Sequence, residues 1–509
     1  MKKVFAVILA LLMSSTWTSL SAQSRKVQIK RVEIENEKDV DIQRCDPVGK
    51  SGMLLTLKSG EKQKRLENNK EIITFCKYDT ALKMVKTADV LCAEQRIRPE
   101  NDYFTDGNNL FRACMFRRGD YELLYLDGET LTPTFFQGDI DRRSDVKARR
   151  AAGGYAYIMG IADKLPYVLC INVKTGEKNV IEVPVEDKRS SVYVSFETAD
   201  NVEESYLFLK ERVNKEYVLK FYVISKNKIV QNYTITSEGD GKIPSTVYAC
   251  KTDDGSYIIS GTYSIEGSKA KNANTKIASG VFVKKIKNGA TVFSNYTNFH
   301  DIRNYLECFS DRYQKRVEKG KEKKAKKGEE LNVNYLMLPH KIIIDNDKYI
   351  LLGESYYEKT HMEARTEIGM DGKAKTTWHR VFDGYAFTHF FIIEYDQHGN
   401  VIWSNAAPFS APLSKKLSRH ISISKEANSI DLVYPKYGKM NYVTFSLDGE
   451  LTKRDEVPYV DEGERLKTAE LLDTDYWYEN NFLITGLLKI KSDDGKRRVF
   501  SVNKLTFKK

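Results

Sequence analysis

The sequence predicts an all-β fold, a β-propeller of seven or eight four-stranded blades with one inserted amphipathic helix. The first observation is a recurring stretch in which an aromatic residue stands four positions before a glycine, with β-favouring apolar residues between them. It occurs at residues 257–261, 349–353 and 482–486, with a looser copy at 156–160. Continuous apolar runs of this kind are typical of strands that are covered on both faces. We interpret the stretch as the inner strand of a repeated unit.

A second periodic feature is a hairpin with fixed offsets. Gly289 is followed four residues later by Phe293, and Gly399 is followed four residues later by Trp403. Serine and asparagine follow the aromatic residue in both places. A glycine turn between two β-rich runs is a hairpin signal, and the repeated offset indicates an internal repeat.

The spacing of the turns gives the size of the repeat. Gly128 and Gly176 are 48 residues apart, Gly176 and Asn227 are 51 apart, and Gly399 and Gly449 are 50 apart. This suits a four-stranded propeller blade. Gly289 and Gly399 are 110 residues apart, which predicts an insertion in that region. Two β-sandwich domains are the competing fold, but they do not predict one offset that recurs along the whole chain.

In chain order, a strand at 27–35 has no partner nearby and is predicted to complete the final sheet of a closed ring. A first unit contains strands at 53–57 and 71–76. The further units are expected to begin at 106 and 153 and to span 192–235, 247–298, 341–409, 421–459 and 469–507.

The fifth and sixth units are joined by a region with helical character. Phe299, Ile302, Tyr305 and later apolar residues up to Val317 recur every three or four positions, which predicts an amphipathic helix. Asn298 is the expected N-cap. We therefore place a helical, basic insertion at residues 298–330.

The N-terminus has the features of a secretion signal. Lys2 and Lys3 precede an apolar run at 4–13 that is too short to anchor in a bilayer, and small residues end it at Ala22. Residues 1–22 are expected to be removed, leaving residues 23–509 as one exported domain, periplasmic or secreted. No later stretch is predicted to cross a membrane, and a monomer is expected.

The formal net charge is +11, but the excess is local. Residues 312–327 contain nine basic and two acidic side chains, so a general nucleic-acid-binding surface is not expected. This basic interaction segment could meet an anionic partner. The residues proposed for this contact are eight of the nine: Arg312, Lys315, Arg316, Lys319, Lys323, Lys324, Lys326 and Lys327.

The seven cysteines are dispersed and contain no Cys-x-x-Cys pair, so a cysteine-based zinc site is not expected. Most lie in apolar strand-like runs and are interpreted as small core residues. Export permits a disulfide, and Cys76 with Cys92 is the first candidate pair.

The blade hairpins resemble those of bacterial β-propeller proteins. Residues 172–178 (Asn-Val-Lys-Thr-Gly-Glu-Lys) look like the hairpin of quinoprotein-type blades, although the tryptophan that follows in that pattern is missing. The Ala22-Gln23 junction, the high tyrosine and lysine content and these blades also resemble exported Bacteroidota proteins of unknown function. The resemblance implies an architecture, and it implies neither a cofactor nor catalytic residues.

No protease, hydrolase, Walker or dinucleotide-binding motif is present, so no catalytic residue, cofactor or metal site is predicted. The richest polar and aromatic stretch is a long loop expected at 356–385, whose aromatics and imidazoles would suit a sugar or a peptide. A long β-hairpin packed by its own aromatics is the alternative. The candidate ligand-binding residues are Tyr356, Tyr357, His361, Trp378, His379, Asp475 and Trp477.

The sequence therefore favours a non-enzymatic binding or scaffolding propeller of the cell envelope that recognises a protein or a glycan through loops on one face. The alternative is a propeller hydrolase or lyase that acts on glycans with carboxylates from several blades. A deep central pocket with two carboxyls of different protonation would favour the enzyme. In a third reading, the basic segment is the functional part and the propeller is its platform.

Overall fold

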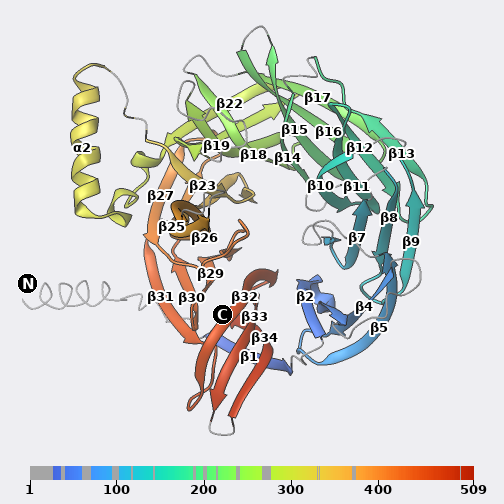
Figure 1. The fold of residues 1–509 in the computed structure, drawn as a ribbon. Coiled ribbons are helices and arrows are strands. Elements are labelled where there is room, and N and C mark those ends of the chain that lie inside the picture. Colours follow the sequence, from blue (N-terminus) through green and yellow to red (C-terminus); the bar gives the residue numbers. More distant parts are fainter. Residues whose placement is uncertain are drawn as a thin grey trace, which may run out of the picture.

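The computed structural model describes residues 27–35, 40–59, 70–93, 103–115, 119–140, 144–186, 191–198, 203–213, 216–236, 241–265, 277–328, 331, 333–368, 374–492 and 495–508. Within these residues the strands form eight antiparallel sheets, seven with four strands and one with six. The sheets follow one another around a ring (Figure 1). The prediction of a β-propeller is confirmed, and eight sheets fit eight blades.

Blades 1 to 4 each use four consecutive strands. They are β2 (Val40–Pro47), β3 (Met53–Ser59), β4 (Lys70–Tyr78) and β5 (Met84–Ala93); β6 (Tyr103–Asp106), β7 (Asn109–Met115), β8 (Tyr121–Leu126) and β9 (Pro133–Gly138); β10 (Ser144–Ala152), β11 (Tyr155–Ala162), β12 (Leu165–Asn172) and β13 (Lys178–Glu182); β14 (Val192–Thr198), β15 (Glu204–Val213), β16 (Glu216–Ser225) and β17 (Lys228–Thr236).

Blades 5 to 8 include the longer strands and the closure of the ring. They are β18 (Lys242–Lys251), β19 (Tyr257–Ile265), β21 (Gly280–Lys287) and β22 (Ala290–Asn298); β20 (Ile277–Ala278), β23 (Tyr335–Pro339), β24 (Ile343–Asp345), β25 (Lys348–Ile368), β26 (Ala374–Tyr395) and β27 (Val401–Pro408); β28 (Ser422–Lys425), β29 (Ile430–Lys436), β30 (Lys439–Phe445) and β31 (Leu451–Pro458); β32 (Arg465–Tyr478), β33 (Asn481–Ser492), β34 (Gly495–Phe507) and β1 (Val27–Glu35).

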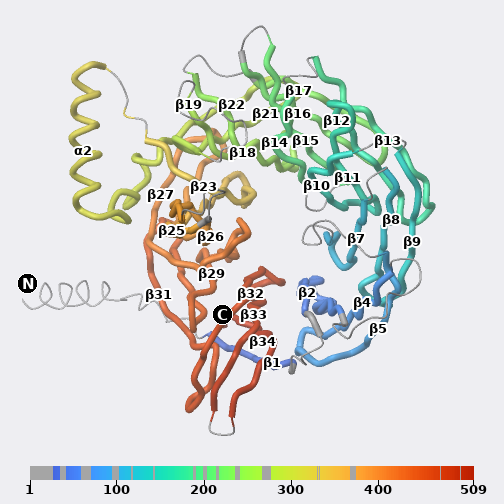
Figure 2. Tube along the Cα trace, viewed as in Figure 1, coloured from blue at the N-terminus to red at the C-terminus, as the bar shows by residue number. Residues whose placement is uncertain are grey.

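The first strand of the chain completes the last sheet. β1 pairs with β34 over its full length, from Val27 opposite Phe507 to Glu35 opposite Val499. Figure 2 shows the blue strand β1 beside the red strand β34. The predicted closure of the ring by residues 27–35 is therefore confirmed.

The recurring apolar stretch is not the innermost strand: it is the second strand of its sheet in blades 3, 5 and 8, and in blade 6 it pairs with β23 and β24 on one side and with β26 on the other. It lies in β19, β25 and β33, and its looser copy lies in β11. The first strands β6, β10, β14 and β18 contact one another around the axis. A second strand has a blade on each side: Ile258 packs with residues of blade 6 and Ile259 with residues of blade 4. Burial on both faces explains the unbroken apolar run.

The repeated hairpin offset is explained by packing between neighbouring blades. A Cβ on Gly399 would come within 2.4 Å of the Phe293 ring, and one on Gly449 within 2.3 Å of the Trp403 ring. Both glycines have φ of +81°, a conformation that other residues adopt only with strain. The aromatic side chain of one blade thus lies on the turn glycine of the next.

The insertion after blade 5 does not form the single helix predicted from residue 299 to 317. Asn298 is an N-cap, as expected, but of the short 3₁₀ helix η3 (Phe299–Asp301), and its side chain accepts from the His300 N–H at 3.0 Å. A second 3₁₀ helix, η4 (Leu306–Cys308), follows, and α2 (Asp311–Ala325) begins only after Phe309, which is extended. The apolar residues before it pack into the interface of blades 5 and 6.

The long loop predicted at 356–385 is made of strands. β25 and β26 form an extended hairpin whose pairing continues from Tyr356 opposite Phe387 to Ile368 opposite Ala374. The alternative interpretation, a long β-hairpin, is correct. We refer to the part beyond the body of blade 6, residues 357–368 and 374–384, as the arm.

All seven cysteines lie in the described part of the chain, and Cys76 and Cys92 are both free thiols. The suggested disulfide between Cys76 and Cys92 is wrong. The two residues are on adjacent strands, but Cys76 lies opposite Thr87 and Cys92 opposite Glu71, so the register keeps the sulfurs apart. Within the described ranges, the remaining helical element is the 3₁₀ helix η1 (Gly49–Ser51). Among the residues described, none of the helices has the length and apolarity needed to cross a bilayer.

Candidate functional site

A pocket of about 690 Å³ lies between the first strands of blades 8, 1 and 2. β32 and β2 face each other near the middle of the ring (Figure 1). We call it the axial pocket. Its lining includes Asp46, Tyr103, His420, Asp473 and Asp475. One wall is the axial segment, residues 409–421, which connects blade 6 to blade 7.

A local irregularity in β32 places the two aspartates in the pocket. The register between β32 and β33 shifts between Glu470 and Asp473, opposite Gly486. A bulge of this kind re-aims the side chains that follow it. A Cβ on Gly486 would meet the end of the Leu472 side chain at 2.3 Å, so the Leu472 side chain occupies the space that the glycine leaves. Asp473 and Asp475 then share one face of the strand.

Blade 1 contributes an ion pair to the same pocket. The Arg44 guanidinium donates two hydrogen bonds to Asp46, through Nε at 2.5 Å and through Nη2. Its carbon lies 5.6 Å from the centre of the Tyr103 ring, and Arg112 lies 5.5 Å from the same ring. The positive charge of Arg44 is therefore directed to Asp46 and to an aromatic face.

The carboxyls of β32 are perturbed mainly by burial. Burial raises the pKa of Asp475 well above its usual range, the neighbouring charges of Asp473 and Asp46 add to this, and Arg44 opposes it. Burial also raises the pKa of Asp473, against the N–H of Thr474 and the charge of Arg44. Although protein surrounds Asp473, its side chain is exposed to the open space of the pocket, so we assign the stronger perturbation to Asp475.

His420 closes the pocket from the axial segment. It is 4% exposed, and neither ring nitrogen has a hydrogen-bond partner among the described residues. Burial lowers its pKa, partly offset by the charge of Glu354. The ring is therefore neutral near pH 7, and a neutral imidazole carries one free acceptor nitrogen.

The axial segment is held by three contacts. The fully buried Glu354 carboxylate accepts from the backbone N–H groups of His420 and Ile421, each at 3.0 Å, and from His340 Nε2 at 2.7 Å. Arg419 donates to the Pro339 carbonyl at 3.0 Å and to the Tyr248 hydroxyl. Ser414 pairs with Tyr385 at the base of the arm. These contacts fix the wall of the pocket against three other parts of the fold.

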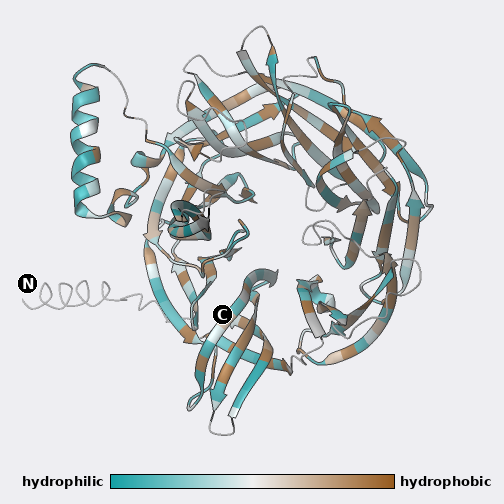
Figure 3. Ribbon diagram, viewed as in Figure 1, coloured by the Kyte–Doolittle hydropathy of each residue, from teal (hydrophilic) through white to brown (hydrophobic). Residues whose placement is uncertain are grey.

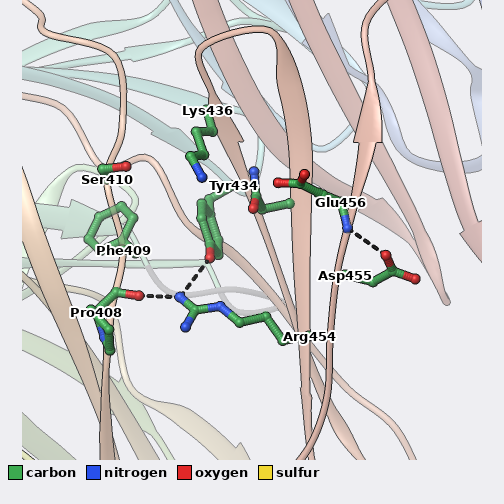
Figure 4. A pocket seen from close by; sticks show the side chains of 9 residues that line it. Pro408, Phe409, Ser410, Tyr434, Lys436, Arg454, Asp455 and Glu456 are labelled. Carbon is green, nitrogen blue, oxygen red and sulfur yellow. Dashed lines mark hydrogen bonds between the residues drawn. The ribbon is translucent and has the colours of Figure 1, made fainter.

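A second pocket, of about 530 Å³, lies between the end of β27 and blade 7 (Figure 4). Its main polar group, Arg454, donates to the Pro408 carbonyl and, at 3.3 Å, to the Tyr434 hydroxyl. Asp455 accepts from Tyr442 at 2.8 Å. Because these charged groups already have protein partners, this pocket is the weaker candidate for ligand recognition.

Of the residues proposed from the sequence, Asp475 is in the axial pocket. Trp477 is 4% exposed, and its indole N–H donates to the Gly52 carbonyl at 2.8 Å, so it packs between blades 8 and 1. Tyr356 is buried against Phe387, with ring centres 5.8 Å apart.

The other four proposed residues lie on the arm. Tyr357 and Trp378 are 49% and 64% exposed. His361 Nδ1 is 2.6 Å from Asp383, and His379 Nε2 is 2.9 Å from the Thr377 hydroxyl. Ligand binding by these arm residues stays a prediction, since they do not gather in one pocket with Tyr356 or Asp475. The described residues contain no group of three side chains placed to bind a metal ion.

The basic segment forms most of α2, which projects from the ring and is mostly hydrophilic (Figure 3). Arg312, Lys315 and the other proposed members are exposed, except Lys324, which is half-buried. Val317 is the buried residue of the helix. A role of this segment in binding an anionic partner stays a prediction.

Sequence reasoning missed Arg44, Asp46 and His420. The alternation of β2 gives no sign that Asp46 faces β32, because the two strands are brought together only by closure of the ring. His420 follows a region without regular structure, and its burial depends on Glu354, a residue of another blade. The acidic pattern of β32 was the visible signal.

The raised pKa of Asp475 predicts a pH-dependent stability difference. Folding favours the protonated carboxyl, so the stabilising contribution is complete below the ordinary carboxyl pKa near 4 and is lost as the pH rises through the folded-state value. Asp475→Asn should therefore match the wild type near pH 4. It should become more stable than the wild type at higher pH, by up to about 1.4 kcal/mol per pH unit within that window.

Urea denaturation of both proteins between pH 4 and pH 8 measures this difference. Asp253→Asn, in an exposed turn of blade 5, is the matched control and should show a difference that does not vary with pH. A pH-independent difference for Asp475→Asn as well would mean that the carboxyl titrates normally.

No protein-family model and no curated protein matches this chain. Solved structures are similar at the level of fold. The β-propeller domain of the Trilobed protease from Pyrococcus furiosus is 7% identical, with 78% of this chain and 96% of that chain covered and a TM-score of 0.35. TolB from Acinetobacter baumannii is 10% identical, with 85% and 79% covered and a TM-score of 0.28.

A puromycin-hydrolyzing peptidase from Mycobacterium tuberculosis is 8% identical, with a TM-score of 0.36, and the match covers 78% of this chain and 52% of the peptidase. At these identities and TM-scores the likeness concerns the propeller fold alone.

Proposed function

We propose that this protein is a non-enzymatic binding propeller of the cell envelope, whose protein or glycan partner places a group in the axial pocket. The observation that carries the proposal is the axial pocket itself. It combines the carboxyls of Asp473 and Asp475 with a buried imidazole whose ring nitrogens make no hydrogen bond within the described structure. Concave sites with a few convergent polar groups are the usual form of a binding site.

Exposed apolar side chains beside the pocket are evidence that the partner is large. Leu413, which lines the pocket, is 47% exposed, and Phe382 at the base of the arm is 37% exposed. The rings of Phe382 and Tyr385 lie 5.0 Å apart, and Tyr385 pairs with Ser414. The exposed apolar side chains therefore continue from the arm to the pocket, as expected of a surface that a partner covers.

Site-specific photo-crosslinking tests the proposal. A photoreactive amino acid at Leu413, in cells that naturally make the protein, is expected to capture one partner of defined mass. Ser418→Trp, which fills the pocket, should abolish this product. The same photoreactive residue at Ser410, exposed in the second pocket, is the control and should not give it. Equal products at both positions, or none at Leu413, would contradict the proposal.

The alternative function, a glycan hydrolase or lyase, is favoured by one observation. Asp475, a carboxyl with a raised pKa, shares the pocket with Asp46, a carboxylate paired with Arg44. General acid and base catalysis uses carboxyls in unlike environments. If the protein is an enzyme, reducing ends should appear from a polysaccharide panel and Asp475→Asn should abolish them. A binding protein should release none above background.

Export is part of the proposal. Its support is the charged and apolar pattern of residues 1–22, which lie outside the described residues. N-terminal sequencing of the protein from its natural host should then begin at Gln23. A chain that keeps Met1 in the cell would contradict the envelope location.

A further inference from the structure

The charges of the axial pocket are unbalanced. Three aspartates, Asp46, Asp473 and Asp475, face it from two strands, and the guanidinium of Arg44 is engaged by the first of them. The charge of Lys416, on the axial segment, lowers the pKa of Asp473. The Lys416 side chain is exposed. Two acidic groups thus share a protein-lined space with little compensating positive charge.

The other groups that face these carboxyls do not supply the missing charge. Tyr103 and Cys45 are neutral groups whose pKa values are raised by burial. Glu470 adds a further acid to the lining, and Lys415 is exposed. His420 is neutral, and its acceptor nitrogen is unused within the described structure. The pocket therefore offers the carboxyls of Asp473 and Asp475 together with an imidazole acceptor.

We propose that the ligand group received by the axial pocket is an organic cation, an alkylammonium or a guanidinium, bound by Asp473 and Asp475 and by the buried His420. The inference rests on the proposed function and names the chemistry of its ligand. Such a cation carries several N–H donors, which match two carboxylates and an imidazole acceptor. A pocket of about 690 Å³ is large enough for an arginine or lysine side chain or for a free polyamine.

The charge balance predicts what happens on binding. An entering cation favours the ionised form of a neighbouring carboxyl. A proton held by the Asp473–Asp475 pair is then released to the solvent, while the cation keeps its own protons. Binding should accordingly tighten as the pH rises through the range in which this pair titrates.

Isothermal titration calorimetry on the mature full chain tests this inference. The probes are a Gly-Gly-Arg-Gly-Gly amide peptide, spermidine, N-acetylglucosamine and inorganic phosphate. The peptide and spermidine are expected to bind, and the tighter of the two distinguishes a protein side chain from a free polyamine as the source. Comparison of phosphate-free buffers with different ionisation heats should show proton release on binding.

Asp475→Asn and Asp473→Asn should each weaken binding of the cationic probes by about tenfold or more, the effect of removing a charged hydrogen-bond partner. Asp253→Asn is the matched control and should bind as the wild type does. Because Asp475→Asn is expected to be at least as stable as the wild type, weaker binding will not reflect unfolding.

The outcomes separate the two proposals. Binding of the sugar or of phosphate that is lost in Ser418→Trp would overturn the inference about charge and leave the pocket as a binding site. Failure of the peptide and spermidine to bind while Leu413 still captures a partner would also overturn this inference only. Failure of both, together with no crosslinked partner, would overturn the proposed function as well.

Discussion

A chain that begins at residue 36 is expected to melt about 10 °C below one that begins at residue 27. The truncation removes β1, whose Val27 and Ile29 pack on the cluster between blades 7 and 8, and whose Val32 and Ile34 pack on the cluster between blades 8 and 1. Four half-buried apolar side chains contribute about 5 kcal/mol to the free energy of unfolding. In a protein of this size, each kcal/mol lost lowers the melting temperature by roughly 2 °C.

The loss should also expose β34 as a sheet edge. Unpaired edges lead to aggregation, so the shorter chain should be less soluble on heating. Scanning calorimetry gives the melting temperature, and light scattering gives the onset of aggregation. A synthetic peptide of residues 27–35 added in trans should restore part of the difference.

The matched control keeps β1 and changes its solvent face. Gln28→Ala with Lys30→Ala alters two exposed side chains of the same strand and should shift the melting temperature by less than about 1 °C. If the truncated chain melts with the longer one, closure of the ring does not contribute to stability.

Glu354→Ala is expected to destabilise the protein by about 3–5 kcal/mol, the usual effect of breaking a buried charged network. The substitution leaves three buried donors without an acceptor: the His340 imidazole and the backbone N–H groups of His420 and Ile421. Urea denaturation measures the loss. Glu354→Gln, which keeps one acceptor oxygen, should be destabilised less.

The same substitution should loosen the axial segment. Lys415 and Lys416 are exposed on it, so trypsin should cleave there faster in Glu354→Ala than in the wild type. Glu358→Ala, on the exposed part of the same strand, is the control and should change neither stability nor cleavage. Unchanged cleavage in Glu354→Ala would mean that Arg419 and Ser414 hold the segment without the carboxylate.

The propeller could be predicted from the sequence because packing between blades imposes the same requirement at each interface. The turn glycines Gly399 and Gly449 recur because each receives an aromatic ring from the preceding blade. The position of the apolar stretch within its blade could not be predicted in the same way. Burial on both faces makes a second strand apolar, and the pattern does not reveal that a more polar strand lies between it and the axis.

Elements that depend on tertiary packing were predicted less well. Residues 299–317 have helical periodicity, but they do not form one helix. Phe299, Ile302 and Tyr305 pack in the interface of blades 5 and 6, and the α-helix begins later, at Asp311. The loop expected at 356–385 became a hairpin because its polar residues alternate across two paired strands, where solvent covers both faces of the arm.

Only the part of the candidate site on β32 could be predicted from the sequence. Asp475 stood out on β32, whereas Asp46 is more than 400 residues away in the sequence and reaches the pocket through closure of the ring. His420 depends on a contact with another blade, and no local pattern carries that information. A site assembled from strands of different blades leaves no continuous motif.

The pairing of β1 with β34 has a consequence for biosynthesis. Arg31 and Asn503, which are hydrogen-bonded across this pair, are 472 residues apart in the chain. At ribosomal speeds of 5–20 residues per second, about half a minute to a minute and a half separates their synthesis. Throughout that interval β1 lacks the strand with which it pairs. A chaperone that shields β1 would therefore act before the last blade is made, and arrest of translation near the end would leave the ring open.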